Sequence, residues 1–280
     1  MNEILEALGR TGIIPVITIN DAEKAIPLAL SLIAGGIPVA EVVFRTPQAE
    51  TAIRRICREV PGIMVGAGTV LNTGQVDRAI DAGALFIVSP GFNPKVAAHA
   101  IKKGIPFIPG CFTPSDIEQA LEHGLEVVKF FPAEQAGGIE YLKAVSAPYT
   151  NVRFIPTGGI NSLNIAKYTA FDKTLACGGS WMAAPELIDA GNFEKITSLC
   201  REAILNMLGF SLIDLDIKTK HLTIGTNSVV KALSYLEKLG INLNAGSVKK
   251  DESKKDKSGN IRSACLQEEI AGFTLKLIQR

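Results

Sequence analysis

The chain has 280 residues, of which 47% are apolar, and its formal charge at pH 7 is +1. A chain of this length can bury a large core, and its near-neutral charge gives no indication of a nucleic-acid or membrane partner. No apolar run reaches the ~18 residues of a membrane span, and the N-terminus MNEILEALGRTG lacks the basic-then-apolar order of a secretory signal. We therefore expect a soluble globular protein of the cytoplasm.

The cysteines and histidines give no indication of a metal site. The five cysteines contain no CxxC pair, and the three histidines are far apart in the sequence. Neither a zinc site nor a disulfide framework follows from this distribution. We expect reduced, structural thiols, no metal and no cofactor.

Short apolar runs alternate with amphipathic segments up to Leu208. The apolar runs, which we predict to be strands, are GIIPVITI (12–19), VAEVVFR (39–45), IMVGAGTV (63–70), LFIVSPG (85–91), PFIPGCF (106–112), EVVKFFPA (126–133), VRFIPTGG (152–159) and KTLACGGS (173–180). The segments between them have helical periodicity, with Pro, Ser or Thr near several starts and Gly after several ends. Eight βα units predict an α/β fold in which a parallel sheet closes into a (β/α)8 TIM barrel, with a doubly wound open sheet as the alternative.

The pattern changes after Leu208. The segments HLTIGTN, SVVKALSYLEKLG, INLN, IRSACLQEE and GFTLKLIQR predict the order β-α-β-β-β. We therefore expect a barrel over residues 1–208 and a separate small α+β module over residues 209–280. The charged stretch VKKDESKKDKSGN (248–260) mixes lysines with Asp251, Glu252 and Asp256, which favours a solvated hairpin loop over an anion-binding patch.

One lysine, Lys129, lies in the middle of a predicted core strand. Alternate side chains of a barrel strand point inward, so Lys129 can face the interior while Val128 and Phe130 face the helices. The same alternation places Glu41 and Arg45 on one face of the second strand. Two charges on one face of a core strand are hard to explain as packing against helices, so we expect these side chains to point inward.

Polar and glycine residues also gather at the carboxyl ends of the predicted strands, where barrel enzymes place their chemistry. Thr69 ends the third strand, Thr157-Gly158-Gly159 ends the seventh and Gly178-Gly179-Ser180 ends the eighth. The two Gly-Gly turns are suited to binding phosphate through exposed backbone N–H groups, although a single Gly-Gly turn is common in proteins.

This set of residues is suited to carbon–carbon bond chemistry. A desolvated lysine that is partly neutral near neutral pH can attack a carbonyl and form a Schiff base, which acts as an electron sink. Glu41 can transfer the protons that the reaction needs, while Arg45 and Thr69 suit a substrate carboxylate. The substrate that we expect is an α-keto acid. The alternative is a catalytically silent phosphosugar-binding barrel with a partner-docking tail, in which Lys129 and Glu41 form only a buried ion pair.

The motifs of the barrel region resemble those of the 2-keto-3-deoxy-6-phosphogluconate aldolase / 4-hydroxy-2-oxoglutarate aldolase family. They are IPVI near the start, EVVFRT (41–46), VGAGTVLN (65–72), SPGFNP (89–94), PGCFTPSD (109–116), VKFFPAE (128–134), IPTGGI (155–160) and GGSWM (178–182). The resemblance implies a class I, metal-independent aldolase of (β/α)8 fold, usually a homotrimer. It implies that pyruvate is released with glyceraldehyde 3-phosphate or with glyoxylate.

The resemblance also implies a role for each matched residue. Lys129 corresponds to the Schiff-base lysine and Glu41 to the proton-transfer residue. The substrate-binding residues that it implies are Arg45 and Thr69 at the pyruvate carboxylate, Pro90 and Phe131 as walls around the pyruvyl group, and Gly158, Gly159 and Ser180 at the phosphate end, to which we add Thr157 and Gly179.

The segment from about Gly209 resembles the glyoxalase-like (vicinal oxygen chelate) extension of some bacterial members of this family. The resemblance is carried by HLTIGTNSV (221–229) and EEIAGFTLKLIQR (268–280). A metal site of that superfamily ordinarily draws on two βαβββ modules, and this chain has room for one. Its final strand offers Thr274 and Lys276 in place of an acid, so we expect a degenerate interaction module in which His221 is at most a leftover ligand.

Overall fold

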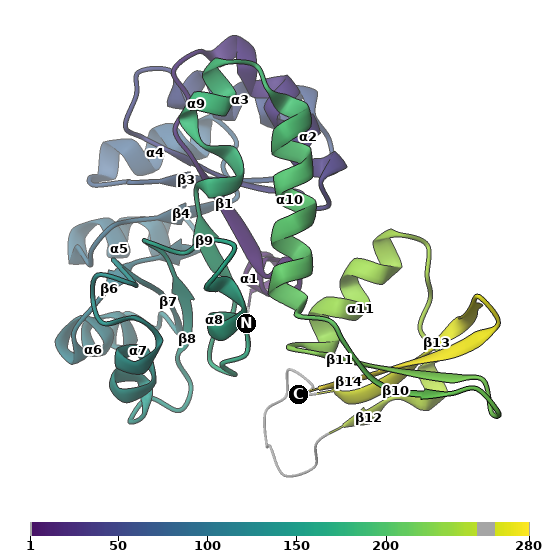
Figure 1. The fold of residues 1–280 in the computed structure, drawn as a ribbon. Coiled ribbons are helices and arrows are strands. Elements are labelled where there is room, and N and C mark those ends of the chain that lie inside the picture. The colour runs from purple at the N-terminus through teal and green to yellow at the C-terminus, as the bar shows by residue number, and fades with distance from the viewer. Residues whose placement is uncertain (1, 251–260, 280) are drawn as a thin grey trace. The chain divides into compact units, whose positions relative to one another are not determined.

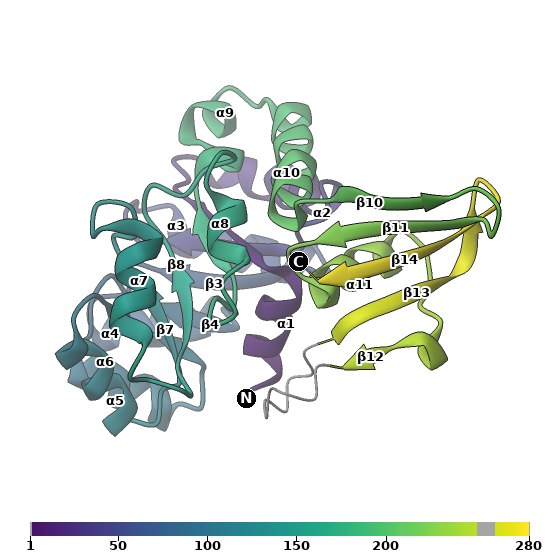
Figure 2. The same cartoon turned by 60° about the horizontal axis from the view of Figure 1, so that its bottom comes forward.

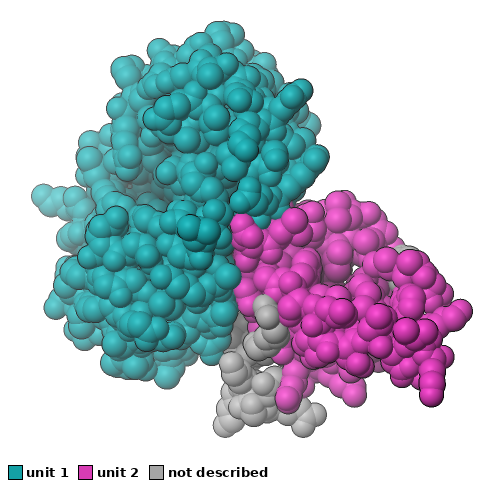
Figure 3. Space-filling view, in the orientation of Figure 1, with its two compact units in different colours: residues 1–203 teal, residues 204–280 magenta. Residues whose placement is uncertain are grey.

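The computed structural model describes residues 2–250 and 261–279 of the chain. It contains two compact units, residues 1–203 and residues 204–280, which are coloured separately in Figure 3. The division falls within helix α10 (Phe193–Leu208), whereas the boundary expected from the sequence is the end of that helix. No described helix is both long and apolar enough to span a membrane.

The strands of the first unit pair in parallel wherever the structure describes a ladder, as the βα alternation predicts. They are β1 (Ile13–Ile17), β2 (Val39–Val43), β3 (Met64–Gly68), β4 (Phe86–Val88), β5 (Phe107–Ile108), β6 (Gly110–Cys111), β7 (Val127–Phe130), β8 (Arg153–Pro156) and β9 (Cys177–Gly179). Each of the eight predicted runs contains at least one of these strands. Strands such as β2, β4 and β7 are buried along their whole length, which is typical of parallel sheets covered on both faces.

The fifth predicted run differs from expectation because it forms two strands. Pro109 separates β5 from β6 and has no backbone N–H group to donate to a ladder. β5 ends a sheet with the order β5-β4-β3-β2-β1-β9, and β6 begins a second sheet with the order β6-β7-β8. Two isolated parallel bridges, Phe154↔Thr174 and Thr157↔Gly178, link the β8 segment to the β9 segment.

Helices follow the strands in alternation (Figure 1). They are α1 (Glu3–Thr11), the 3-10 turn η1 (Ala22–Lys24), α2 (Ala25–Ala34), α3 (Ala49–Glu59), α4 (Thr73–Asp81), α5 (Pro94–Lys102), α6 (Pro114–Glu122), α7 (Gly138–Ser146), α8 (Ile165–Thr169), η2 (Trp181–Ala183), α9 (Pro185–Asp189) and α10. Several begin with side-chain caps that satisfy free N–H groups: Asn72 caps α4, Asn93 caps α5, and Thr113 with Asp116 forms a capping box on α6. Each of these caps fixes the residue at which a loop ends and the next helix begins.

In its described residues, the second unit has a five-stranded sheet and one α-helix of its own, α11 (Val229–Lys238). Figure 2 shows its strands side by side in the order β10-β11-β14-β13-β12. Their bounds are β10 (Ser211–Asp216), β11 (His221–Thr226), β12 (Lys249–Lys250), β13 (Ile261–Ile270) and β14 (Phe273–Gln279), with the turn η3 (Ala245–Ser247) before β12. β11 and β14 pair in parallel, and the other described neighbours are antiparallel.

Two details of this unit depart from the predicted order. The INLN segment is not a strand, because only Leu243 forms an isolated bridge, to Leu266. The start of the expected charged loop, Lys249–Lys250, is instead the strand β12. The rest of that loop, with Asp251, Glu252 and Asp256, lies outside the described residues.

Candidate active site

Lys129 of β7 and Glu41 of β2 form a buried ion pair between the two sheets of the first unit. Lys129 Nζ lies 3.3 Å from Glu41 Oε1, and the two residues are only 6% and 2% exposed. On the opposite face of β7, the Phe130 ring stacks on Tyr141 of α7 with ring centroids 6.0 Å apart. The alternation read from the sequence therefore matches the structure at these positions, and it brings an amine and a carboxylate together in a site shielded from water.

A glycine makes room for the Glu41 carboxylate. A Cβ atom at Gly68, the last residue of β3, would lie 2.4 Å from Glu41 Oε1. Any side chain there would displace the carboxylate from its place beside Lys129. Sequence reasoning missed this residue, although the GAGT stretch that contains it was visible as a glycine-rich strand end.

Thr69 directly follows β3 with a strained backbone. Its φ angle is 57°, in the left-handed region, where β-branched residues are rare. Such a conformation costs about 1–3 kcal/mol and persists where the surroundings or a function require it. Thr69 is half-buried, and its strained backbone makes it a candidate functional residue.

Arg45 does not lie on a strand, contrary to expectation. β2 ends at Val43, and the chain then turns so that the Arg45 N–H donates to the Val43 carbonyl at 2.8 Å. Arg45 is exposed just past the carboxyl end of β2. Strand alternation stops at the end of the ladder, so it could not place this side chain.

Pro90 and Phe131 are half-buried residues in the loops after β4 and β7. The loop that carries Pro90 runs against β6, because a Cβ atom at Gly110 would lie 2.0 Å from the Pro90 carbonyl oxygen. The Phe131 ring lies beside the lysine, with Lys129 Nζ 5.2 Å from its centroid. Of these two, Phe131 is directly in contact range of the amine.

Thr157 and the last residues of β9 lie next to each other. Thr157 is buried and bridges to Gly178, at which a Cβ atom would lie 2.3 Å from Thr157 Oγ1. Gly179 is buried against the Trp181 ring, and Ser180 is exposed just beyond the strand end. The glycines allow the two strand ends to approach closely.

The Gly158–Gly159 turn follows Thr157 at the end of β8. Both glycines have positive φ angles, 101° and 75°, which other residues adopt only with strain. Backbone bonds fix the turn against the loop after β7, from Ala133 N to Thr157 O at 2.8 Å and from Glu134 N to Gly158 O at 3.0 Å. Among the described residues, the N–H groups of Gly159 and Ile160 have no acceptor.

Other groups with possible chemistry are engaged elsewhere. Burial, with a smaller effect from the Asp116 charge, raises the pKa of the Cys111 thiol to about 12, so a reactive thiolate is disfavoured. His99 Nε2 lies 2.9 Å from Asp77 Oδ1, and His123 Nδ1 lies 2.9 Å from the Gln119 carbonyl oxygen. Within the described residues, no three His, Cys, Asp or Glu side chains are grouped so that they could hold a metal ion.

The sequence of the chain matches known aldolases over most of its length. The family model described as KDPG and KHG aldolase matches residues 4–199. A 2-dehydro-3-deoxy-phosphogluconate aldolase of Treponema pallidum is 50% identical over 204 residues, 73% of this chain and 97% of that protein. The KHG/KDPG aldolase of Escherichia coli K12 is 44% identical over 200 residues, 71% of this chain and 94% of that protein.

The fold matches as well. One similar solved structure is the KDPG aldolase of Legionella pneumophila, with pyruvate captured as a covalent carbinolamine intermediate. Its TM-score is 0.69 and its sequence identity is 42%, and the match covers 71% of this chain and 97% of that chain. These matches place the chain among the α/β aldolases. It belongs to the KDPG and KHG aldolase family.

Proposed function

We propose that the chain is a class I aldolase that cleaves 2-keto-3-deoxy-6-phosphogluconate to pyruvate and glyceraldehyde 3-phosphate, and 4-hydroxy-2-oxoglutarate to pyruvate and glyoxylate. The observation that carries this proposal is the buried pair of Lys129 and Glu41, at 3.3 Å, in a chain of the KDPG and KHG aldolase family. The carbinolamine captured in the Legionella relative supports a covalent route through an amine.

In the proposed mechanism, the neutral Lys129 amine adds to the C2 carbonyl of the substrate. The carbinolamine loses water to give a protonated imine, which draws electrons from the C3–C4 bond as the C4 hydroxyl gives up its proton and the aldehyde leaves. The resulting enamine takes a proton at C3, and water then releases pyruvate and restores the amine. Glu41, with its carboxylate 3.3 Å from Nζ, is placed to transfer the protons of the dehydration and enamine steps.

The other proposed roles concern substrate binding. Arg45 and Thr69, just after β2 and β3, are proposed to hold the substrate carboxylate, and Phe131 and Pro90 to flank the pyruvyl group. The phosphate end is proposed to bind at the strand ends after β8 and β9, through Thr157, Gly158, Gly159, Gly179 and Ser180. The free N–H groups of the glycine turn support this last assignment.

We also infer that the two parallel sheets close into one (β/α)8 barrel. The inference is supported by the chain passing directly from β5 through Pro109 to β6, and by the bridge between Thr157 and Gly178 at the other junction. A homotrimer in the cytoplasm is proposed from the family resemblance. For the second unit we propose an accessory interaction module without a metal.

The proposal is tested by measuring pyruvate release from each 2-keto acid with the purified full-length chain. We expect turnover of both substrates, a higher kcat/KM for the phosphorylated one, and no loss of activity with EDTA. Lys129→Met should abolish pyruvate release from both substrates, because the nucleophile is gone. If the wild-type chain binds phosphosugars yet releases no pyruvate, the alternative of a catalytically silent barrel replaces this proposal.

A further inference from the structure

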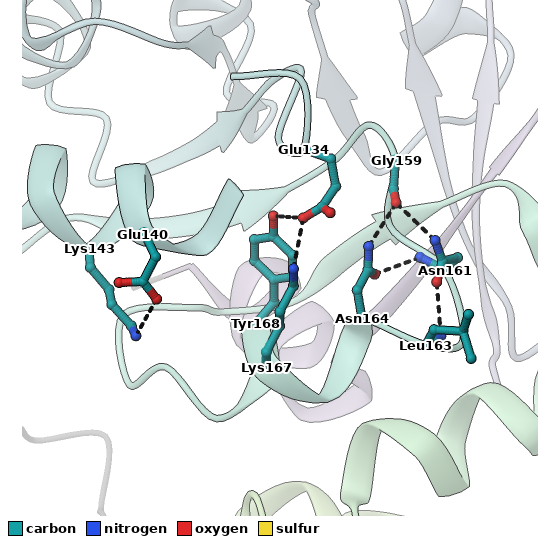
Figure 4. Close-up of polar contacts among 9 residues, drawn as sticks. All are labelled: Glu134, Glu140, Lys143, Gly159, Asn161, Leu163, Asn164, Lys167 and Tyr168. Atoms are coloured by element: carbon teal, nitrogen blue, oxygen red, sulfur yellow. Dashed lines mark hydrogen bonds and ion pairs between the residues drawn. The ribbon is translucent and has the colours of Figure 1, made fainter. Parts of the chain in front are cut away.

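Glu134 joins the loop after β7 to helix α8. Its Oε1 accepts a hydrogen bond from the Tyr168 hydroxyl and lies 3.3 Å from Lys167 Nζ (Figure 4). Tyr168 is fully buried, so the phenol cannot turn to water for another partner. The hydrogen bond from the buried phenol to this carboxylate links the two segments in a fixed direction, and the half-exposed Lys167 adds a weaker ion pair.

The same residue also contacts the glycine turn. The Glu134 N–H donates to the Gly158 carbonyl at 3.0 Å, and a Cβ atom at Gly159 would lie 2.7 Å from Glu134 Cβ. The Glu134 side chain therefore packs directly against the turn while its carboxylate is held by α8.

Two asparagines complete the support from the other side. Asn164 Nδ2 and Asn161 Nδ2 donate to the Gly159 carbonyl at 2.9 Å and 3.2 Å, and the Asn161 N–H donates to Asn164 Oδ1 at 2.8 Å (Figure 4). The carbonyl groups of the turn are thereby engaged within the protein. Its N–H groups at Gly159 and Ile160 have no acceptor among the contacts that the structure describes, and in the proposed function they bind the substrate phosphate.

The charge of Glu134 is balanced where it lies. Burial alone would raise the pKa of Glu134, but the hydrogen bond from Tyr168, together with Lys167 and Asn164, outweighs burial and lowers that pKa. The residue is therefore ionised at neutral pH. The positive charge of Lys167 compensates the negative charge of Glu134. Without Lys167, that negative charge would repel an anion bound at the neighbouring turn.

We infer that Glu134 is a positioning residue for substrate specificity: by linking Tyr168 and Lys167 to the Gly158–Gly159 turn, it sets the affinity for the phosphorylated end of the substrate. The inference rests on the proposed function, in which this turn binds the substrate phosphate. Glu134 does not touch the reacting carbons in this account, so its effect is on binding and not on the chemical step.

The test compares KM and kcat of single variants on 2-keto-3-deoxy-6-phosphogluconate and on 4-hydroxy-2-oxoglutarate. Glu134→Ala and Tyr168→Phe should each raise KM for the phosphorylated substrate about tenfold. The kcat values and the KM for the unphosphorylated substrate should change little. The reason is that a displaced turn weakens its contacts with the phosphate equally in the ground state and the transition state. Glu134→Gln should restore part of the loss, since its amide oxygen can still accept from Tyr168.

Glu140 provides the matched control. Its carboxylate pairs with Lys143 at 2.9 Å on α7, but it is highly exposed and, within the described part of the chain, forms no hydrogen bond or ion pair with the turn (Figure 4). Glu140→Gln should therefore leave both KM values unchanged. Thermal melting of each variant separates a folding defect from a binding defect.

Amide hydrogen exchange gives a readout that does not depend on activity. Exchange in residues 157–164 should be faster in Glu134→Ala than in the wild type and unchanged in Glu140→Gln. The inference is wrong if Glu134→Ala keeps wild-type exchange in this segment, or if a folded Glu134→Ala keeps its KM for the phosphorylated substrate. If the wild-type chain does not prefer the phosphorylated substrate, the proposed binding of phosphate at this turn is wrong, and so is the specificity role of Glu134. The hydrogen-exchange comparison would still test whether Glu134 holds the turn in place.

Discussion

Glu41 is the residue whose chemistry can be changed with the least change of shape. It is 2% exposed and makes its hydrogen bond to Lys129 with one carboxylate oxygen. We predict that Glu41→Gln slows turnover by about 10²-fold or more, because general acid–base catalysis contributes on that scale. Borohydride should still trap some imine on the variant, since the amine remains. A fully active Glu41→Gln would show that protons are transferred by another group.

Thr69 allows function to be separated from stability. Its left-handed backbone, with φ of 57°, is unfavourable for threonine and easy for glycine. We predict that Thr69→Gly melts at the same temperature as the wild type or higher, while KM for 2-keto acids rises because the hydroxyl is lost. Calorimetry and pyruvate-release kinetics provide the two measurements. Unchanged KM in Thr69→Gly would remove this residue from the carboxylate site.

The sequence could place single residues only where a regular ladder holds them. Lys129 and Glu41 follow strand alternation and meet in the structure. Arg45 lies past the end of β2, where alternation no longer applies. The space that Gly68 leaves for the Glu41 carboxylate depends on a contact between two strands, which the sequence of one strand does not reveal. The link from Glu134 to Tyr168 joins positions far apart in the chain, so it too required the structure.

At the scale of elements, helix α6 offers a test of how the strand-end loops are fixed. Asp116 Oδ2 accepts from Phe112 N at 3.0 Å and Thr113 N at 2.8 Å. Burial alone would raise the pKa of Asp116, but the hydrogen bonds from Thr113 and Phe112 outweigh it and lower that pKa. Because the pKa is lower in the folded state, the ionised carboxylate stabilises the fold at any pH above its unfolded-state pKa. This stabilisation is lost as the pH falls through the folded-state pKa.

We therefore predict that Asp116→Asn lowers the free energy of unfolding at neutral pH and that its difference from the wild type shrinks in acid. Urea unfolding of both proteins from about pH 7 to about pH 3 measures this difference. Thr113→Ala, which removes the other half of the capping box, should destabilise at every pH. A difference for Asp116→Asn that grows in acid would contradict the assignment.

The order of the strands in the first unit follows from hydrophobic periodicity and helix-end signals, since each of the eight predicted runs contains at least one strand. Periodicity could not predict that Pro109 divides the fifth run between two sheets, because that outcome depends on which neighbours each half pairs with. In the second unit, INLN resembles a strand in composition but contributes one bridge, while β12 forms within a charged stretch. Edge pairing of this kind is set by the partner strand more than by local propensity.

At the scale of the whole chain, the proposed chemistry uses no residue of the second unit. Every proposed site residue precedes residue 204, and a chain ended at Leu208 keeps α10 complete. The sheet of the second unit has β10 and β12 as its outer strands. An uncovered outer strand can pair with another chain, so we expect the unit to act in assembly.

We predict that the chain truncated after Leu208 folds and releases pyruvate with a kcat close to that of the full chain, while its melting temperature or its oligomeric state changes. Light scattering, thermal melting and the pyruvate-release assay on both chains measure these properties. A truncated chain that is well folded but inactive would mean that the second unit contributes to the active site.

The central claim is that Lys129 is the nucleophile, and covalent trapping tests it most directly. Borohydride added to the full-length protein with pyruvate reduces an imine to a stable amine, and peptide mass spectrometry then locates it. We predict one pyruvyl adduct, on the peptide that contains Lys129, with EDTA making no difference. An adduct on another lysine, or no adduct together with activity that requires an added metal, would contradict the Schiff-base mechanism.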